Sequence, residues 1–233
     1  YGNNRDTLRD LMLFWSSKED KLTSLQEYVD RMPESQEKIY YVCADSVEHA
    51  AKMPQAERVL KAGYEVLYLT VDEDEIVLQM LENAGGKPFV SVADENALPV
   101  TEEEKATVEQ AEKDHKDVLD FAQETLKDQV AKVRLSKILQ SGSVCLTAEG
   151  PVSLEMEKYM NKVEGGQHMK ADRVLELNAD SAPYAALKRA VDAGDQATVE
   201  KYAKLLYGQA LLLADLPLED PAEYAQLVCS LMA

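Results

Sequence analysis

The hydrophobic pattern divides the first hundred residues into alternating strands and helices. Nearly every residue is apolar in the runs "KIYYVCA" (38–44), "YEVLYLTV" (64–71) and "KPFVSVA" (87–93), as is typical of strands covered on both faces. The segments between them, 46–63 and 72–86, have the polar and apolar spacing of helices. Because parallel neighbours need crossover connections, this alternation predicts a small parallel sheet flanked by helices.

Local signals set the ends of several helices in this region. Ser24 is followed three residues later by Glu27, the pattern of a capping box, and this pair predicts a helix start at residue 24. Gly85-Gly86 is interpreted as a helix stop, because glycine readily adopts the left-handed conformation that ends helices. Residues 5–14 have the spacing of an amphipathic helix, and without an initiator Met we expect a fragment of a longer protein.

The composition changes at Asp94. Residues 94–116 contain few large apolar groups and are interpreted as a linker or a solvated helix entrance, so we place a domain boundary here and divide the chain into domains 1–99 and 100–233. The second domain is predicted to mix both element types. Its strands are expected at 133–139, 143–148 and 173–178, and its helices at 117–132, 152–163, 181–194, 195–215 and 220–233.

Charge and cysteine content restrict the classes of partner. The 233 residues contain 25 Lys and Arg against 43 Asp and Glu, a net charge of -18, which disfavours binding to nucleic acid or to an anionic membrane. No apolar run reaches the roughly 20 residues of a membrane helix, and no export signal is evident. Cys43, Cys145 and Cys229 are far apart and lie in apolar stretches, so we expect buried free thiols and a cytoplasmic location.

Catalytic and metal-binding patterns were sought without success. The Gly85-Gly86-Lys87 sequence lacks the rest of a phosphate-binding loop. The three histidines have no Cys or His partner at zinc-like spacing and are interpreted as surface or incidental residues. The run from Asp72 to Glu75 is interpreted as a solvated helix start. We therefore predict no catalytic residue, no metal and no enzymatic activity.

Two apolar surfaces remain as functional candidates. The first is a helical hairpin at the end of the chain, which packs on the preceding sheet or pairs with its own copy in a four-helix bundle; the pattern favours neither. Its apolar positions include Val199, Tyr202, Leu205, Leu206, Leu213, Tyr224, Leu227, Val228 and Leu231.

The second apolar surface lies on the predicted helix at 152–163. Val152, Met156, Tyr159 and Met160 recur at steps of three and four and share one face. Methionine stripes are usually core packing, yet flexible, polarizable side chains also suit surfaces that bind many partners. Glycines on both sides, Gly150 and Gly165-Gly166, would let this helix move as a unit.

Several segments resemble the ninety-kilodalton heat-shock chaperone family, in its bacterial type. The resemblance is carried by "SLQEYVDRMPESQEKIYYV", "GYEVLYLTVDEDEIVLQML", "GKPFVSV", "VRLSKIL", "MEKYM", "LELN" and "LLYGQALLLADLPLEDPAEY". It implies that residues 1–99 are the end of the family's middle domain, a small three-layer α/β unit. Residues 100–233 would be the α+β carboxy-terminal dimerisation domain, whose final hairpin forms an intermolecular four-helix bundle.

The resemblance also implies roles for individual residues. Client-binding positions correspond to Glu75, Ile76 and Gln79 on one helix and to Val152, Met156, Tyr159 and Met160 on another, and the nine apolar hairpin residues become the dimer contact. ATP and magnesium are expected only in the full-length parent, so this chain is expected to hydrolyse no ATP. The expected partners are a second copy and non-native clients. Tetratricopeptide co-chaperones are not expected, because no acidic "MEEVD" tail is present.

Two other classes of function compete with this interpretation. One is an enzyme whose parallel sheet binds a nucleotide at its strand ends, although the glycine fingerprint is missing. The other is a purely structural dimerisation module without client contact.

Overall fold

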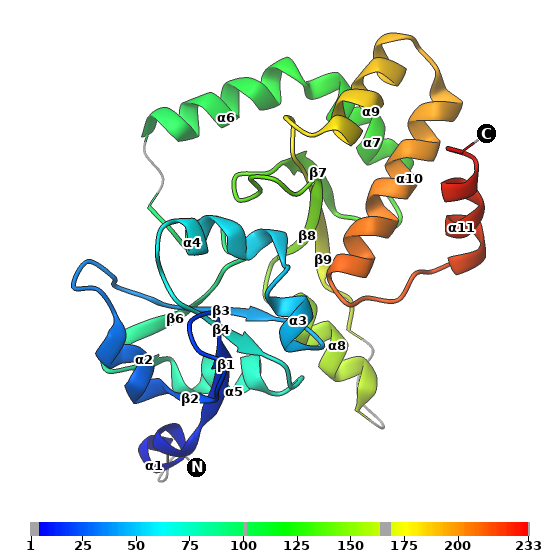
Figure 1. Ribbon diagram of the computed structural model, residues 1–233. Helices are drawn as coiled ribbons and strands as arrows, with labels where there is room; N and C mark the ends of the chain where they lie inside the picture. The colour runs from blue at the N-terminus through cyan, green and yellow to red at the C-terminus, as the bar shows by residue number, and fades with distance from the viewer. Residues whose placement is uncertain (1–4, 100–101, 164–168, 233) are drawn as a thin grey trace. The chain divides into compact units, whose positions relative to one another are not determined.

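The computed structural model describes residues 5–99, 102–163 and 169–232 (Figure 1). The chain divides between Pro99 and Val100 into two units. The described elements of the first unit are α1 (Arg5–Leu11), β1 (Leu13–Ser16), β2 (Thr23–Ser24), α2 (Leu25–Arg31), β3 (Ile39–Cys43), α3 (Val47–Ala50), a 3-10 turn (Pro54–Ala56), α4 (Glu57–Lys61), β4 (Val66–Leu69), α5 (Asp74–Leu81), β5 (Asn83–Ala84) and β6 (Lys87–Ser91).

The described strands of the first unit form one sheet in the order β2-β1-β4-β3-β6-β5. Its centre, β4-β3-β6, is parallel as predicted. The sequence did not predict the antiparallel edges, where β1 pairs with β4 and β5 pairs with β6. The sheet of this unit is therefore mixed rather than purely parallel.

Successive residues of the central strands face two separate cores. Tyr40 packs with α3 and α4 residues such as Val59 on one face, whereas Tyr41 packs with Tyr28 and Leu78 of α2 and α5 on the other. Figure 1 shows α4 and α2 on opposite sides of this sheet. The alternation of side chains along a strand produces this arrangement, in which both tyrosines serve core packing.

Two local predictions in the first unit were wrong. The helix expected over 5–14 ends at Leu11, because Leu13–Ser16 forms a strand that pairs with both β2 and β4. Gly85 and Gly86 do not end a helix. Both have positive φ values, 56° and 75°, and they form the two-residue turn of the β5–β6 hairpin, a turn that requires this backbone conformation. Helix α5 ends earlier, at Leu81.

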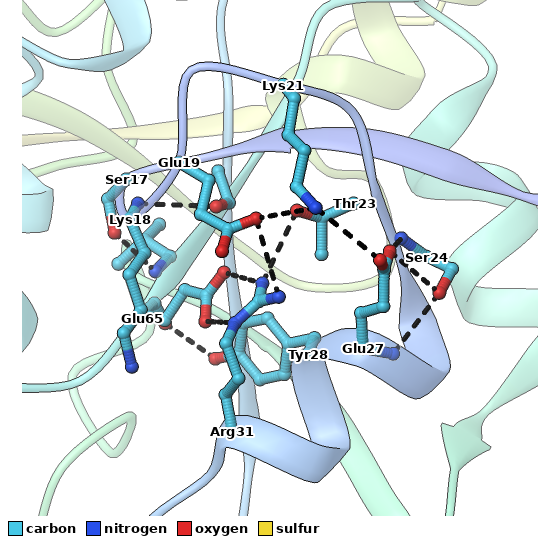
Figure 2. A network of polar contacts seen from close by, with 12 residues as sticks. Ser17, Lys18, Glu19, Lys21, Thr23, Ser24, Glu27, Tyr28, Arg31 and Glu65 are labelled. Carbon is cyan, nitrogen blue, oxygen red and sulfur yellow. Dashed lines mark hydrogen bonds and ion pairs between the residues drawn. The ribbon is translucent and has the colours of Figure 1, made fainter.

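A polar network attaches α2 to the sheet (Figure 2). The capping box predicted for Ser24 and Glu27 is present, which confirms the helix start. At the other end of the helix, Arg31 donates to both carboxylate oxygens of Glu65 at 2.7 and 3.2 Å, and to the Thr23 hydroxyl at 3.3 Å. A planar guanidinium suits such a forked contact, so the Arg of "YVDRM" orients α2 against the strand that follows Glu65.

The second unit places helices against a smaller sheet. Its described elements are α6 (Glu102–Asp114), α7 (Lys116–Thr125), β7 (Lys132–Leu135), β8 (Val144–Glu149), α8 (Leu154–Lys162), β9 (Asp172–Leu177), α9 (Ala182–Asp192), α10 (Gln196–Leu213) and α11 (Pro221–Cys229). The strands are ordered β7-β9-β8, with β7 parallel and β8 antiparallel to β9. One hydrophobic core joins this sheet to α7, α9 and α10.

Three further expectations change, two of them in the second unit alone. The polar segment interpreted as a linker or helix entrance contains a full helix, α6. His115 is not incidental, because its Nδ1 lies 2.7 Å from the hydroxyl of the buried Tyr184. The cysteines are free thiols, but only Cys145 is buried; Cys43 is half-buried and Cys229 is exposed. Among the helices that the structure describes, none has the length and hydrophobicity to cross a bilayer.

Candidate functional site

Helix α8 carries the second predicted client-binding set. It begins at Ser153, whose hydroxyl accepts a hydrogen bond from the Met156 backbone at 3.0 Å. The four predicted residues, Val152, Met156, Tyr159 and Met160, are all half-buried. Three of them lie on this short helix and Val152 lies just before its start, and each keeps part of its surface exposed.

Polar contacts hold the other side of α8. The Glu157 carboxylate accepts hydrogen bonds from the Arg173 guanidinium at 2.5 Å and from the Ala171 backbone at 2.8 Å. Lys158 donates to the Ala214 carbonyl at 3.0 Å. The predicted mobility of this helix stays a prediction, and the Gly165-Gly166 part of it lies outside the described residues. No local pattern marks Glu157 and Lys158 as anchors, because they stand among other polar residues of the helix.

The first predicted client-binding set is split by the structure. Glu75 is buried, with 5% of its surface exposed, and accepts a hydrogen bond from the Tyr41 hydroxyl at 3.0 Å. Its assignment to a client surface stays a prediction that this burial does not support, because Tyr41 of β3 contacts the carboxylate. Ile76 is half-buried and Gln79 is exposed. Met80, 65% exposed and one turn beyond Ile76, lies near them, and this i, i+4 spacing would have identified it.

The α10–α11 hairpin contains the predicted dimer residues, and they differ in exposure. Three are buried within the chain, so their exposure does not support the predicted dimer contact: Val199, Leu205 and Leu206. Five are half-buried: Tyr202, Leu213, Tyr224, Leu227 and Val228. Leu231 is 54% exposed. Leu212 and Met232 were not predicted as dimer residues, but they are 49% and 81% exposed and join the outer apolar surface of the hairpin. A dimer contact through this hairpin would thus use its outer residues.

The two helices of the hairpin approach closely at one glycine. A Cβ atom added to Gly208 of α10 would lie 2.5 Å from the ring of Tyr224 on α11, so only glycine allows this contact. Lys204 joins the same helices by an ion pair to Glu223 at 3.0 Å. Beside them is an open pocket of about 180 Å³, lined by Gln129, Lys204, Tyr207, Gly208, Leu211, Leu218, Glu219, Asp220, Glu223, Tyr224 and Leu227.

Another buried carboxylate lies on strand β9 of the second unit's sheet. Glu176 is 1% exposed and accepts hydrogen bonds from Arg134 at 2.7 Å, Ser136 at 2.7 Å and Thr147 at 3.0 Å. Burial, with a smaller contribution from Glu176, raises the pKa of the Cys145 thiol well above its usual value. A carboxylate occupied by three donors is suited to structural support rather than to metal binding, and a protonated thiol is a poor nucleophile.

A scan of protein families identifies the chain. The model of the family described as "Hsp90 protein" matches residues 2–233. This match contradicts the prediction that the chain has no enzymatic activity, because it assigns residues 2–233 to the Hsp90 family. The missing glycine loop was an insufficient reason to exclude enzymatic activity, since it tested only one type of phosphate-binding site.

Curated relatives extend this result. The chain is 43% identical to the "Chaperone protein HtpG" of Bacillus licheniformis and to that of Bacillus subtilis, and 44% identical to that of Oceanobacillus iheyensis. Each alignment covers 100% of this chain but only 37% of the relative, so the chain spans little more than a third of their length. From the family match over residues 2–233 and the identity along its whole length, the chain belongs to the Hsp90 family.

Proposed function

We propose that this chain is the part of an Hsp90-type molecular chaperone that joins the end of the middle domain (residues 1–99) to the carboxy-terminal dimerisation domain (residues 100–233). In this proposal the whole protein acts with ATP and magnesium in the cytoplasm. Free thiols at Cys43, Cys145 and Cys229 support a reducing compartment. Titration of the chain with ATP measures whether nucleotide binding involves this region.

The chain is proposed to form a homodimer through the outer residues of α10 and α11. Leu212, Leu231 and Met232 expose large apolar surfaces on one hairpin, and this observation carries the proposal. Exposed side chains of this size are stabilised when a second copy covers them. A two-fold pairing of hairpins would produce the expected four-helix bundle.

Sedimentation equilibrium tests the dimer. We expect twice the chain mass of 26.0 kDa at micromolar concentration. Leu231→Asp should restore the single-chain mass, because it buries a charge in the contact, whereas Gln226→Asp on the exposed part of α11 should leave the dimer intact. A wild-type chain that sediments at 26.0 kDa refutes the proposal.

The apolar face of α8 is proposed to bind non-native clients. Its support is the half-buried group formed by Met156, Tyr159 and Met160, whose flexible or amphipathic side chains can contact varied partners. Suppression of the aggregation of an unfolded model protein tests this role. The double variant Met156→Ser, Met160→Ser should lose suppression, while Lys162→Ser on the same helix should retain it. If the double variant suppresses aggregation as well as Lys162→Ser does, the apolar face of α8 does not bind clients, and this result would favour a purely structural dimerisation module.

A further inference from the structure

The guanidinium of Arg173 joins three elements of the second unit. Arg173 lies on β9 and donates to Glu157 of α8 at 2.5 Å and to the hydroxyl of Tyr207 on α10 at 2.8 Å. The Arg173 and Glu157 side chains are only 8% and 5% exposed. Such a forked contact requires arginine, because one planar group reaches two acceptors in fixed directions.

Apolar packing alone attaches α8 weakly. Only Leu154 and Glu157 are buried among the residues of this helix, Leu154–Lys162, all of which the structure describes. A helix with one buried apolar side chain depends on its polar contacts for position. Besides the Arg173 contact, Lys158 donates to the carbonyl of Ala214, the residue that ends α10, where a cation is favoured by the helix dipole. Both contacts reach α10.

The Arg173 contact is incompletely satisfied. Its Nε atom is buried without a hydrogen-bond acceptor among the described residues. An unmatched donor leaves part of the desolvation penalty uncompensated, so this contact opens more readily than a fully paired one. The position of α8 is therefore sensitive to small movements of its polar partners.

Tyr207 also connects this contact to α11. It precedes Gly208, the residue on which the Tyr224 ring rests, and Tyr207 and Tyr224 line the same pocket. A change in the packing of α11 on α10 would therefore displace Tyr207, whose hydroxyl accepts a hydrogen bond from Arg173. The connection between α11 and Arg173 thus consists of neighbouring residues, Tyr224, Gly208 and Tyr207.

We propose that Arg173 is a positioning residue that ties α8 to α10, so that the packing of α11 on α10 determines how firmly the apolar face of α8 is held. The inference rests on the proposed function for its biological meaning, since it connects the self-association hairpin to the client-binding helix. The tie itself is measurable without client and without a dimer.

Amide hydrogen exchange of the whole chain tests the tie. Tyr207→Phe removes only the hydroxyl, and Gln209→Ala at an exposed position of the same helix is the control, since no hydrogen bond of the Gln209 side chain occurs among the described residues. Exchange of the α8 amides should rise about tenfold in Tyr207→Phe, the effect of losing one hydrogen bond to a charged group, and should stay unchanged in the control. Arg173→Lys should give a rise similar to that of Tyr207→Phe, because an ammonium does not reproduce the fork.

The remaining outcomes separate positioning from general stability. Unchanged α8 exchange in Tyr207→Phe overturns the proposal, and so does an equal rise in the β9 amides, which would indicate uniform destabilisation. Tyr224→Ala should raise the exchange rate of the α8 amides in the wild-type background, but it should raise that rate little further when combined with Tyr207→Phe. If the effects of the two substitutions on α8 exchange are additive, the proposal is also overturned. These results do not depend on the aggregation assay, so failure of the proposed client binding remains distinguishable.

Discussion

Tyr28 offers the sharpest test of how the first unit is stabilised. Its ring is fully buried, and its hydroxyl donates to the Glu65 carbonyl at 2.5 Å. The same oxygen accepts hydrogen bonds from the Tyr40 backbone at 3.2 Å and from the Gln36 amide at 3.0 Å. One hydroxyl therefore joins α2, β3 and the residue that precedes β4. Tyr28→Phe keeps the ring and removes only these three contacts.

The expected loss follows from the partners left behind. The Tyr40 N–H loses this acceptor in the interior, and an unsatisfied buried donor costs about 1–3 kcal/mol. The Glu65 carbonyl loses a donor, whereas the Gln36 amide still donates to the Lys38 carbonyl at 2.7 Å. No cavity forms, because the ring remains. We expect Tyr28→Phe to lower the free energy of unfolding by about 2–4 kcal/mol, a large part of the 5–15 kcal/mol typical of a domain.

Urea denaturation followed by tryptophan fluorescence measures this loss. The single tryptophan, Trp15, packs against the first unit's core and reports on that unit. With a slope near 2 kcal/mol/M, the midpoint should fall by about 1–2 M. Tyr68→Phe is the control, since this buried tyrosine has no hydroxyl partner in the described part of the chain. Equal midpoints for the two variants would refute the reasoning.

Four further outcomes are expected. Glu176→Ala should lower stability by about 2–4 kcal/mol, seen as a lower urea midpoint in circular dichroism. The substitution removes the acceptor of Ser136 and Thr147 and leaves the half-buried Arg134 with its contact to Glu149 at 3.4 Å. Gly208→Ala should push the Tyr224 ring away and accelerate proteolysis of α11; an unchanged cleavage rate would contradict the close contact. Cys229 should react with a thiol reagent in the folded chain, and Cys145 only after unfolding. Burial raises the folded-state pKa of Cys145, so its contribution to stability should fall as pH rises above the ordinary thiol value, and Cys145→Ala should remove that dependence.

The local sequence patterns that predicted the structure correctly are those whose residues all lie within one helical turn. The Ser24 and Glu27 box specified the start of α2 because both partners lie three residues apart. The interpretation of Gly85-Gly86 as a helix stop was wrong because these two residues alone do not specify which structure they belong to. A helix end and a two-residue hairpin both use glycine with positive φ, and only the pairing of Asn83 with Pro88 distinguishes them.

Exposure at the candidate sites was less predictable. Glu75 lies in an acidic helix start, yet Tyr41 from a distant strand covers it and accounts for its burial. Helix α10 is apolar on most of its circumference, so its sequence does not reveal which leucines face the unit's own core. Leu206 faces inward and Leu212 outward. This difference is set by where the sheet and the other helices pack.

The sequence by itself determined most element types, the parallel centre of the first sheet and the likeness to the Hsp90 family, because hydrophobic periodicity and short motifs are encoded within continuous segments. Only the tertiary structure decided which side chains remain available to a partner and that Arg173 joins Glu157 to Tyr207. Those contacts link residues 16 and 34 positions away from Arg173 along the chain, and such distant pairings arise from packing rather than from any local pattern.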